Sequence, residues 1–323
     1  MMRKVIACLF IAAVNFLQIQ GCDFDKIKSL TTSGEMSIVV DENVEKLMQD
    51  EIKEFERMNP EAKVNMKIAP TKVAKADLIN GDTKFAVVTR NFTEEEKAVI
   101  EKNKITVKEY PIAIDGIGFI VNNKNPIERV TSEDLKQIFT GGFVSWKDIK
   151  SDQDGDQNKE VNKFFSKSNE KIKLFIQRKN SSTYDYVLDS ILKKTEYSAT
   201  AQICSTSLQV MNGVRDNENA IGIINMNWMT LGKTDTIDST VKALRVSRIS
   251  DSGFQRDYAE FHQGLIFNAK YPYRRSIYVL TTEEGMKLST GFIIFLLGTD
   301  GQKIVLKNSL VPLTQPVRTI QIN

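Results

Sequence analysis

The hydrophobic pattern changes its period within residues 172–194, and this change predicts a strand followed by a helix. Over 172–176, Ile172, Leu174 and Ile176 alternate with other residues, which is the period-2 pattern of a strand. Further on, apolar residues recur at i, i+3, i+4, i+7 and i+8, which is the stripe of an amphipathic helix. These residues are Tyr184, Val187, Leu188, Ile191 and Leu192. Ser181 or Ser182 is the predicted N-cap, because both precede the stripe and carry a hydroxyl.

The same alternation of strand and helix patterns covers much of the chain. Strands are predicted over 36–40, 64–68, 85–89, 111–121, 220–224, 241–246 and 274–281. Helices are predicted over 44–55 with Asn43 as the cap, from Thr93 onward, over 131–139 after a capping box, and over 292–297, where the residues are apolar all round. Strands that alternate with helices indicate parallel sheets covered on both faces, so an α/β fold is expected.

Two features interrupt this pattern. Residues 150–170 are a polar insertion, in which three aspartates (152, 154 and 156) surround Gly155. The spacing resembles a calcium loop, but the glycine comes one place early and the terminal glutamate is missing, so a solvated turn is expected. Residues 111–121 contain Asp115-Gly116 and Gly118, which are expected to interrupt the strand.

The first 22 residues resemble a bacterial lipoprotein signal. Arg3 and Lys4 precede an apolar run over 5–17, and Gly21 stands directly before Cys22. This pattern predicts a signal peptide over 1–21 and a lipid on Cys22, which would hold the protein on the periplasmic side of a bacterial membrane. The polar segment 22–34 is expected to be a tether. A plain signal peptide cleaved elsewhere is the alternative.

The composition narrows the function further. The 302 residues after the signal (323 minus 21) are enough for two domains. Without Arg3 and Lys4 there are 42 basic and 41 acidic residues. The sequence contains no stripe of basic residues, so a nucleic-acid partner is not expected. Cys204 has no partner once Cys22 is lipidated, so no disulfide is expected. The single histidine, His262, argues against a multi-histidine metal site and against an enzyme. We expect no metal and no cofactor.

The loop before the predicted helix at 184–192 is a candidate anion site. The free N–H groups of its first turn, the hydroxyls of Ser181, Ser182 and Thr183, and the guanidinium of Arg178 would converge on one spot. The simpler interpretation is an ordinary capped helix after a strand.

Several segments, taken in order, resemble one family. Residues 115–146 are similar to D-G-x-x-x-x-V-N-x-x-N-P … L-T-x-x-x-L-x-x-I-F-x-G-x-x-x-W, and Arg178 with residues 181–183 resembles R-x-x-x-S-G-T. Residues 220–224, 271–274 and 301–312 match further on. Together they resemble the phosphate-binding proteins of ABC importers (PstS-like), which are type II periplasmic binding proteins, over roughly residues 35–323.

The resemblance implies two α/β domains joined by two crossing strands, with the ligand between them. The crossings are expected near 111–114 and 271–274. Domain I would comprise 35–111 and 272–323, and domain II 112–271. The resemblance also implies that Asp115-Gly116 provides the backbone bend of the hinge.

The ligand-binding residues that the resemblance implies are Asn43, Thr71, Thr89, Arg90, Arg178, Ser181, Ser182 and Thr183. Ser182 replaces a glycine, and its Cβ is expected to crowd the anion. Arg90 falls where many members have a carboxylate that accepts the ligand's proton. We therefore expect weaker discrimination of phosphate from sulfate, unless Asp41, Glu42 or Asp115 reaches the ligand. The alternative is that Arg90 turns away to Glu94 or Glu95.

A binding module is the leading hypothesis. It would capture a small oxyanion, above all phosphate, and present it as a monomer to an ABC permease complex. The first alternative is a non-transport sensor or scaffold of the same fold with altered or lost ligand specificity. An enzyme is the last, because the Ser181-Ser182 pair has no base beside it.

Overall fold

The structure is a computed structural model that describes residues 24–149, 155–167, 171–229, 239–247 and 257–314. The predicted signal peptide, Cys22 and most of the aspartate-rich turn at 152–156 lie outside these ranges. None of the helices within them has the length and apolar character needed to cross a bilayer.

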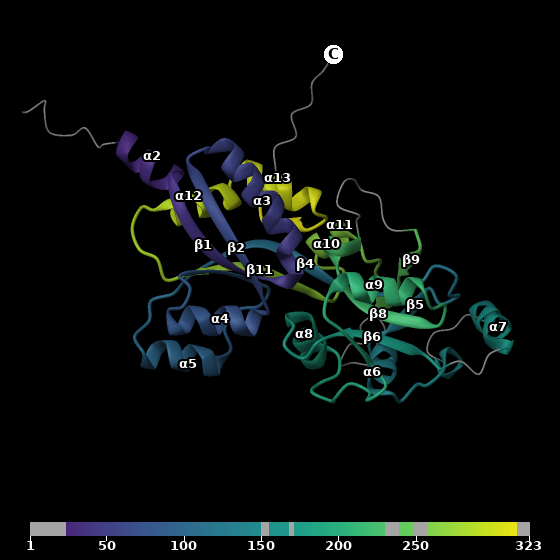
Figure 1. The fold of residues 1–323 in the computed structure, drawn as a ribbon. Helices are drawn as coiled ribbons and strands as arrows, with labels where there is room; N and C mark the ends of the chain where they lie inside the picture. Colours follow the sequence, from purple (N-terminus) through teal and green to yellow (C-terminus); the bar gives the residue numbers. More distant parts are fainter. Residues whose placement is uncertain (1–23, 150–154, 168–170, 230–238, 248–256, 315–323) are drawn as a thin grey trace, which may run out of the picture.

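A ten-stranded mixed sheet organises the described residues (Figure 1). Its main order is β2-β1-β3-β11-β4-β8-β6-β7, and β9 and β12 also pair with β4. The strands are β1 (Gly34–Asp41), β2 (Ala62–Ala69), β3 (Phe85–Val88), β4 (Lys108–Asn122), β6 (Lys173–Gln177), β7 (Gln202–Cys204), β8 (Ala220–Asn225), β9 (Val241–Ala243), β11 (Arg274–Thr281) and β12 (Val311–Pro312). β5 (Arg129–Thr131) and β10 (Arg245–Ser247) form a separate parallel pair.

Strand β4 joins two lobes. Up to Gly116 it pairs antiparallel with β11, and from Ile117 it pairs antiparallel with β8. We call the part around β1, β2, β3 and β11 the first lobe, and the part around β6 to β9 the second lobe. Within each lobe the predicted parallel pairing is present, since β1 pairs parallel with β2 and β3, and β6 with β7 and β8. The antiparallel strands β4 and β11 cross between the lobes.

The expected interruption of β4 at Asp115-Gly116 is wrong. The strand is continuous over Lys108–Asn122, and Gly116 keeps ordinary strand geometry. A Cβ on Gly116 would lie 2.3 Å from Cδ1 of Ile266 and 2.8 Å from Cε2 of Phe261. In this structure the glycine therefore provides room for these side chains.

The core of the first lobe lies on both faces of its sheet, because successive side chains of a strand point to opposite faces. On β1, Ile38 and Val40 pack with Phe55 and Phe292, whereas Val39 packs on the other face with Leu78. The helices of this lobe are α2 (Phe24–Thr32), α3 (Glu45–Met58), α4 (Thr71–Asn80), α5 (Glu94–Lys102), α12 (Leu288–Leu297) and α13 (Thr299–Lys307), with the 3-10 turn η1 (Glu42–Val44) before α3.

The second lobe has its own core around Phe119, Phe139 and Trp146, and the Trp146 indole N–H donates to the carbonyl of Asn219. Its helices are α6 (Ser132–Thr140), α7 (Gly155–Phe164), α8 (Ser182–Ser190), α9 (Ser207–Arg215), α10 (Met226–Met229) and α11 (Gln263–Phe267), with the 3-10 turns η2 (Trp146–Asp148) and η3 (Phe165–Lys167). The predicted capping box at Thr131 is confirmed, and the helix predicted from Thr93 onward also begins with a capping box.

Several element predictions are wrong in detail. The polar insertion contains helix α7 rather than only a turn, and 241–246 forms two strands that pair with different partners. Helix α12 is not buried all round, since Ile294 is 63% exposed. The segment expected to be a tether forms α2, and the carbonyl oxygen of Thr31 lies so close to Gly291 of α12 that a Cβ there would be 1.9 Å away.

Candidate ligand-binding site

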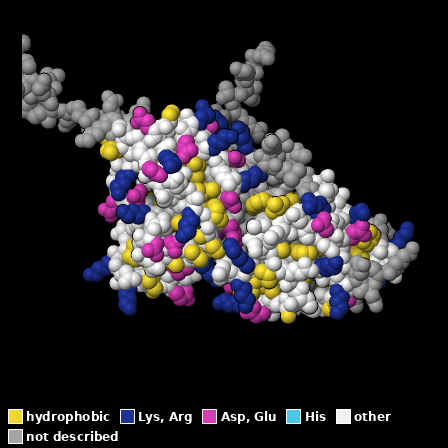
Figure 2. All heavy atoms as spheres, viewed as in Figure 1, with side chains coloured by type: hydrophobic (Ala, Val, Ile, Leu, Met, Phe, Trp, Pro, Cys, Tyr) yellow, Lys and Arg dark blue, Asp and Glu magenta, His cyan; other side chains and the backbone are white. Residues whose placement is uncertain are grey.

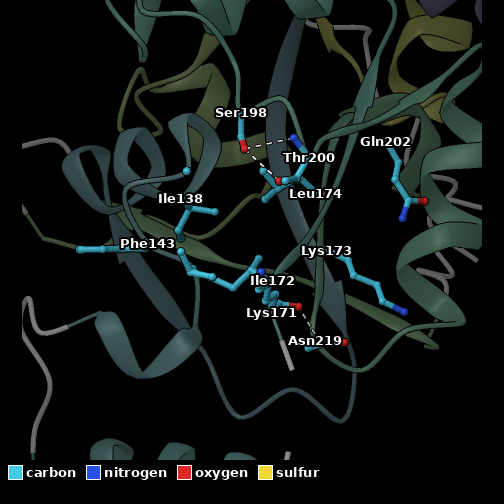
Figure 3. A pocket seen from close by; sticks show the side chains of 12 residues that line it. Ile138, Phe143, Lys171, Ile172, Lys173, Leu174, Ser198, Thr200, Gln202 and Asn219 are labelled. Atoms are coloured by element: carbon cyan, nitrogen blue, oxygen red, sulfur yellow. Dashed lines mark hydrogen bonds between the residues drawn. The ribbon is translucent and has the colours of Figure 1, made fainter. Parts of the chain in front are cut away.

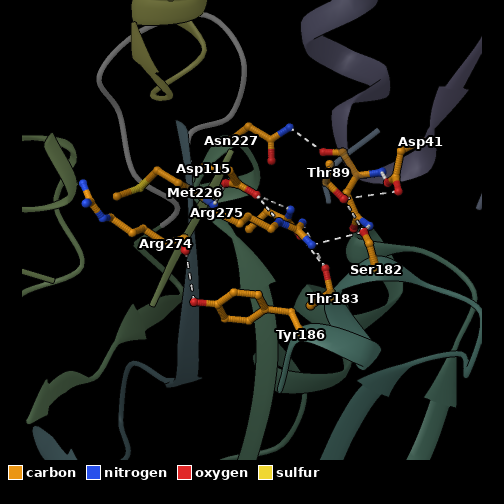
Figure 4. A network of polar contacts seen from close by, with 12 residues as sticks. Asp41, Thr89, Asp115, Ser182, Thr183, Tyr186, Met226, Asn227, Arg274 and Arg275 are labelled. Carbon is orange, nitrogen blue, oxygen red and sulfur yellow. Dashed lines mark hydrogen bonds and ion pairs between the residues drawn. The ribbon is translucent and has the colours of Figure 1, made fainter. Parts of the chain in front are cut away.

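A buried polar cluster lies between the lobes, where parallel strands end. Strands β1, β3 and β6 end at Asp41, Val88 and Gln177, and α8 begins shortly after β6. The carboxyl ends of parallel strands are the usual place for ligands in α/β sheets. The polar residues at these ends therefore come together although they are far apart in the sequence (Figure 4).

The amino terminus of α8 forms one side of the cluster. Ser181 is the N-cap, and its Oγ accepts the N–H of Tyr184 at 3.1 Å. Ser182 and Thr183 follow in the first turn and are 2% and 1% exposed. The first N–H groups of a helix have no partner within the helix and favour negative charge. The predicted position and cap of this turn are confirmed.

The hydroxyl oxygen of Ser182 is the centre of the cluster. It is contacted by Nδ2 of Asn43 at 3.0 Å, Oγ1 of Thr89 at 2.5 Å and Nη1 of Arg275 at 3.1 Å. Asn43 and Thr89 belong to the first lobe and Ser182 to the second. The hydroxyl of Ser182 thus bonds to residues of the other lobe.

A buried carboxylate lies behind these hydroxyls. Asp41 accepts the backbone N–H of Asn43 at 2.7 Å and the hydroxyls of Thr71 and Thr89, the latter at 3.3 Å. Asp41 therefore caps η1, and the prediction of Asn43 as the helix cap is wrong. The side chain of Asn43 is free to reach across the cleft, where its Oδ1 accepts Nε2 of Gln177 at 3.0 Å.

Arg275 is the guanidinium within the cluster. Its Nε donates to Asp115 Oδ2 at 3.1 Å, and its Nη1 and Nη2 reach Ser182 Oγ and Thr183 Oγ1 at 3.1 and 3.3 Å (Figure 4). Asp115 also accepts Nδ2 of Asn225 at 2.7 Å. Burial raises the pKa of Asp115, although Arg275 and Asn225 oppose the shift. The guanidinium of Arg275, balanced by the carboxylate of Asp115, therefore lies beneath the first turn of α8.

The two arginines that were predicted to bind the ligand, Arg178 and Arg90, bond to carboxylates outside the cluster. Arg178 pairs with Glu42 and is 43% exposed at its side chain, and its spacing to Ser181 is one residue shorter than in R-x-x-x-S-G-T. Arg90 donates to Glu96 at 3.2 and 3.3 Å. Glu96 also binds the buried Lys75 at 2.5 Å, and these two cations lower its pKa against the opposing effect of burial. Of the predicted ligand residues, the structure thus brings together all except Arg178 and Arg90.

A cavity of about 280 Å³ opens onto the cluster between the lobes. Its walls come from both lobes and are formed by Thr89, Arg90, Asn91, Ser182, Asp185, Tyr186, Asp189, Ser190, Arg275, Ser276 and Tyr278. A second cavity of about 430 Å³ lies in the second lobe beside Ile138 and Phe143, and none of its lining residues belongs to the cluster (Figure 3). The cavity between the lobes is therefore the one that the polar cluster serves.

Sequence reasoning missed Arg275 and Asn225 as members of the site, and it considered Asp115 only as a possible acceptor of the ligand's proton. A partial signal for Arg275 was present, because Arg275 alternates with Ile277 and Val279 on one face of the predicted strand; the structure buries all three. A buried arginine requires a partner, and Asp115 lies directly opposite it in the antiparallel pairing of β11 with β4.

Comparison with known proteins places the chain in a family. Residues 28–300 match the family described as "PBP superfamily domain". The chain belongs to this superfamily. Its curated relatives include the phosphate-binding protein PstS of Staphylococcus saprophyticus, 26% identical over 81% of this chain and 73% of the relative. Another is PstS of Pseudomonas aeruginosa, 24% identical over 90% of this chain and 86% of the relative.

Solved structures of PBP superfamily members agree with the fold. A substrate-binding protein assigned to a phosphate ABC transporter of Clostridium perfringens, solved with bound phosphate, has a TM-score of 0.69 and 24% identity, covering 87% of this chain and 100% of that one. An ABC-type phosphate transport receptor from Vibrio cholerae has a TM-score of 0.63 and 20% identity, covering 86% and 100%. The predicted type II periplasmic-binding-protein fold is confirmed. The names of these relatives describe binding proteins, in agreement with the prediction of a binding module rather than an enzyme.

Proposed function

We propose that this chain is a membrane-anchored solute-binding lipoprotein that captures a small oxyanion, most of all phosphate, between its lobes and delivers it to an ABC importer. The observation that carries the proposal is the convergence of Ser182, Thr183 and Arg275 on one buried point at the amino terminus of α8. Hydroxyls, free helix N–H groups and a guanidinium are the donors that recognise tetrahedral oxyanions.

The two lobes act as the clamp. We keep 35–111 with 272–323 as domain I and 112–271 as domain II. The separate hydrophobic cores of the two lobes support this division, except that Ile112 and Ala113 pack in the first core and Tyr273 and Val311 in the second. Contacts across the cleft hold the lobes together in this structure, including Lys72 with Asp185 at 3.0 Å and Tyr186 Oη with the carbonyl of Arg274 at 3.1 Å. Opening would release the anion to the permease.

The surface agrees with a small-molecule ligand. Figure 2 shows basic and acidic side chains interspersed over the visible face of both lobes, without a basic stripe. A nucleic-acid partner would require such a stripe. The visible face therefore gives no support to a nucleic-acid partner. The proposed protein is a monomer whose partners are the anion, the membrane and the permease complex.

Lipidation of Cys22 would hold the protein on the periplasmic side of the membrane. The Cys22→Ala variant of the full-length protein should leave the membrane fraction or accumulate as an unprocessed precursor, and it should not incorporate a fatty-acid analogue. An unchanged membrane fraction and the same absence of label in the parent would contradict the anchor.

Binding of the anion is tested by equilibrium dialysis of the full-length protein with labelled phosphate, with arsenate and sulfate as competitors. Micromolar affinity corresponds to about 8 kcal/mol, which several charge-assisted hydrogen bonds of about 1.5–3 kcal/mol each can supply. Thr183→Asp should abolish binding, because it places a negative charge against the ligand. Thr195→Asp, at an exposed position after α8, is the matched control and should bind as the parent does.

A parent protein that retains none of these three anions would contradict the proposed function. Equal loss of binding in Thr195→Asp would show that the effect of Thr183→Asp is not local to the site.

A further inference from the structure

Three arginines lie at or near the cleft, and they differ in what they touch. Arg178 is paired with Glu42 at the rim of the cleft, and the side chain of Arg178 is 43% exposed. Arg90 lines the cavity, but its guanidinium bonds to Glu96 and to the carbonyl of Asn91. Arg275 is the one among these three whose guanidinium reaches the hydroxyls of the α8 turn.

The geometry of Arg275 suits an anion. It stands on β11 directly opposite Asp115 of β4, where the two strands cross between the lobes. The pair is buried, with side-chain exposures of 5% and 0%. A guanidinium has five N–H donors in a fixed fork, and partners among the described residues occupy three of them. The remaining donors lie on the two Nη atoms, which are the atoms that reach the α8 turn.

The hydroxyl of Ser182 marks the position of an anion oxygen. Donors from Asn43 and Arg275 and the hydroxyl of Thr89 all lie within 3.1 Å of Ser182 Oγ, and the cavity of about 280 Å³ opens beside it. A neutral hydroxyl is a weaker acceptor than an anion, because charge-assisted hydrogen bonds are about twice as strong as neutral ones. An oxyanion that displaces this hydroxyl would therefore strengthen every contact that it takes over.

Arg178 is less suited to this role. It would have to leave Glu42 before it could bind a ligand, and exchange of one carboxylate for another anion at this partly exposed position gains little. Arg275 needs no such exchange, since Asp115 occupies its Nε and leaves both Nη atoms facing the α8 turn.

We propose that Arg275, and not Arg178, is the guanidinium that binds the oxyanion in this protein. The Ser182 side chain turns away, and one anion oxygen takes its place between Asn43, Thr89 and Arg275. Asp115 balances and orients Arg275 without touching the ligand. This inference rests on the proposed function, because it names the cation of the same site.

The test compares variants of the two arginines in the full-length protein by calorimetric titration with inorganic phosphate. Arg275→Lys should weaken binding by tenfold to a hundredfold, because an ammonium cannot hold Asp115 and two further acceptors in one plane. Arg178→Lys and Arg178→Ala should change the affinity by less than threefold. Circular dichroism and thermal unfolding monitor the fold of each variant.

A second variant keeps the test valid if Arg275→Lys does not fold. The double substitution Arg275→Gln with Asp115→Asn removes both buried charges together, so it avoids an unpaired buried carboxylate. It should fold and bind phosphate at least tenfold more weakly than the parent. Folded Arg275 variants with parental affinity, or a tenfold loss in Arg178→Ala alone, would overturn the proposal. A parent that binds neither phosphate nor arsenate nor sulfate would instead refute the proposed function, and the assignment of Arg275 with it.

Discussion

The centre and the rim of the cleft each hold an arginine–carboxylate pair, and the two pairs differ in burial. Arg275 and Asp115 are 5% and 0% exposed at their side chains, whereas Arg178 and Glu42 are 43% and 13% exposed. Both pairs join residues distant in sequence. The central pair is further bonded to Ser182, Thr183 and Asn225. The comparison teaches that the arginine identified by the sequence motif is not the one that the fold buries beside the α8 turn.

The largest expected effect is on stability at the centre. Asp115→Ala leaves Arg275 buried without its carboxylate and should lower the free energy of unfolding by about 3–5 kcal/mol. Glu42→Ala breaks the partly exposed rim pair and should cost less than about 1 kcal/mol. Urea unfolding of both variants measures the difference. Equal losses would show that the two pairs are not different in kind.

Glu51 extends the comparison to a buried carboxylate that is bonded to no arginine in the part of the chain that the structure describes. Glu51 on α3 is 0% exposed, and among the described residues neither of its carboxylate oxygens has a hydrogen-bond partner. Burial, and to a lesser extent Asp50, raises the pKa of Glu51 to about 9. The folded protein therefore keeps a proton that the unfolded chain releases near pH 4.5. Stability should fall by about 1.4 kcal/mol per pH unit between these two values.

Glu51→Gln removes this dependence, because the amide carries no charge at any pH. At pH 7 the variant should be more stable than the parent by about 3 kcal/mol, and at pH 5 the two should be nearly equal. Urea unfolding at pH 5, 7 and 9 tests this, with Glu101→Gln at an exposed position of α5 as the control. Parallel pH profiles for parent and Glu51→Gln would mean that Glu51 has a partner or is ionised in the folded protein.

Ser182→Gly tests whether the central hydroxyl competes with the ligand. The glycine removes both the hydroxyl bonded to Asn43, Thr89 and Arg275 and the Cβ beside the cavity. Phosphate affinity should rise by about tenfold, which corresponds to roughly the net value of one hydrogen bond. Ser205→Gly, at an exposed position of the second lobe outside the site, is the control and should bind as the parent does. Calorimetry that shows a lower affinity for Ser182→Gly would make the hydroxyl a ligand contact instead.

The smallest expected effect concerns Arg90. The sequence suggested that Arg90 would weaken discrimination against sulfate, but its guanidinium bonds to Glu96. The carboxylate of Asp41 accepts the hydroxyl of Thr89, which in turn contacts the centre of the site. Arg90→Ala should therefore change the ratio of phosphate to sulfate affinity by less than twofold. Asp41→Asn should reduce that ratio more, because Thr89 would lose the acceptor to which it can pass a ligand proton. Competition titrations at pH 7 separate the two, and a larger change in Arg90→Ala would restore the original interpretation.

The fold followed largely from local patterns, and the site only in part. Alternating periods placed most strands and helices, and the Thr93, Thr131 and Ser181 caps were recognisable from residue type alone. Arg275 could not be assigned in the same way, because its role depends on the pairing of β11 with β4. That pairing joins residues 160 positions apart, and no local period encodes it. Arg178 shows the converse, since its motif was recognisable but Glu42 holds it at the rim.

The central claim is that an oxyanion binds between Arg275 and the α8 turn. A crystal structure of the parent protein grown with phosphate tests it most directly. We predict one phosphate within hydrogen-bond distance of an Arg275 Nη atom and of the first N–H groups of α8, with the Ser182 hydroxyl displaced from Asn43 and Thr89. A phosphate bound to Arg178 at the rim, with Arg275 still bonded to Ser182 and Thr183, would contradict the account.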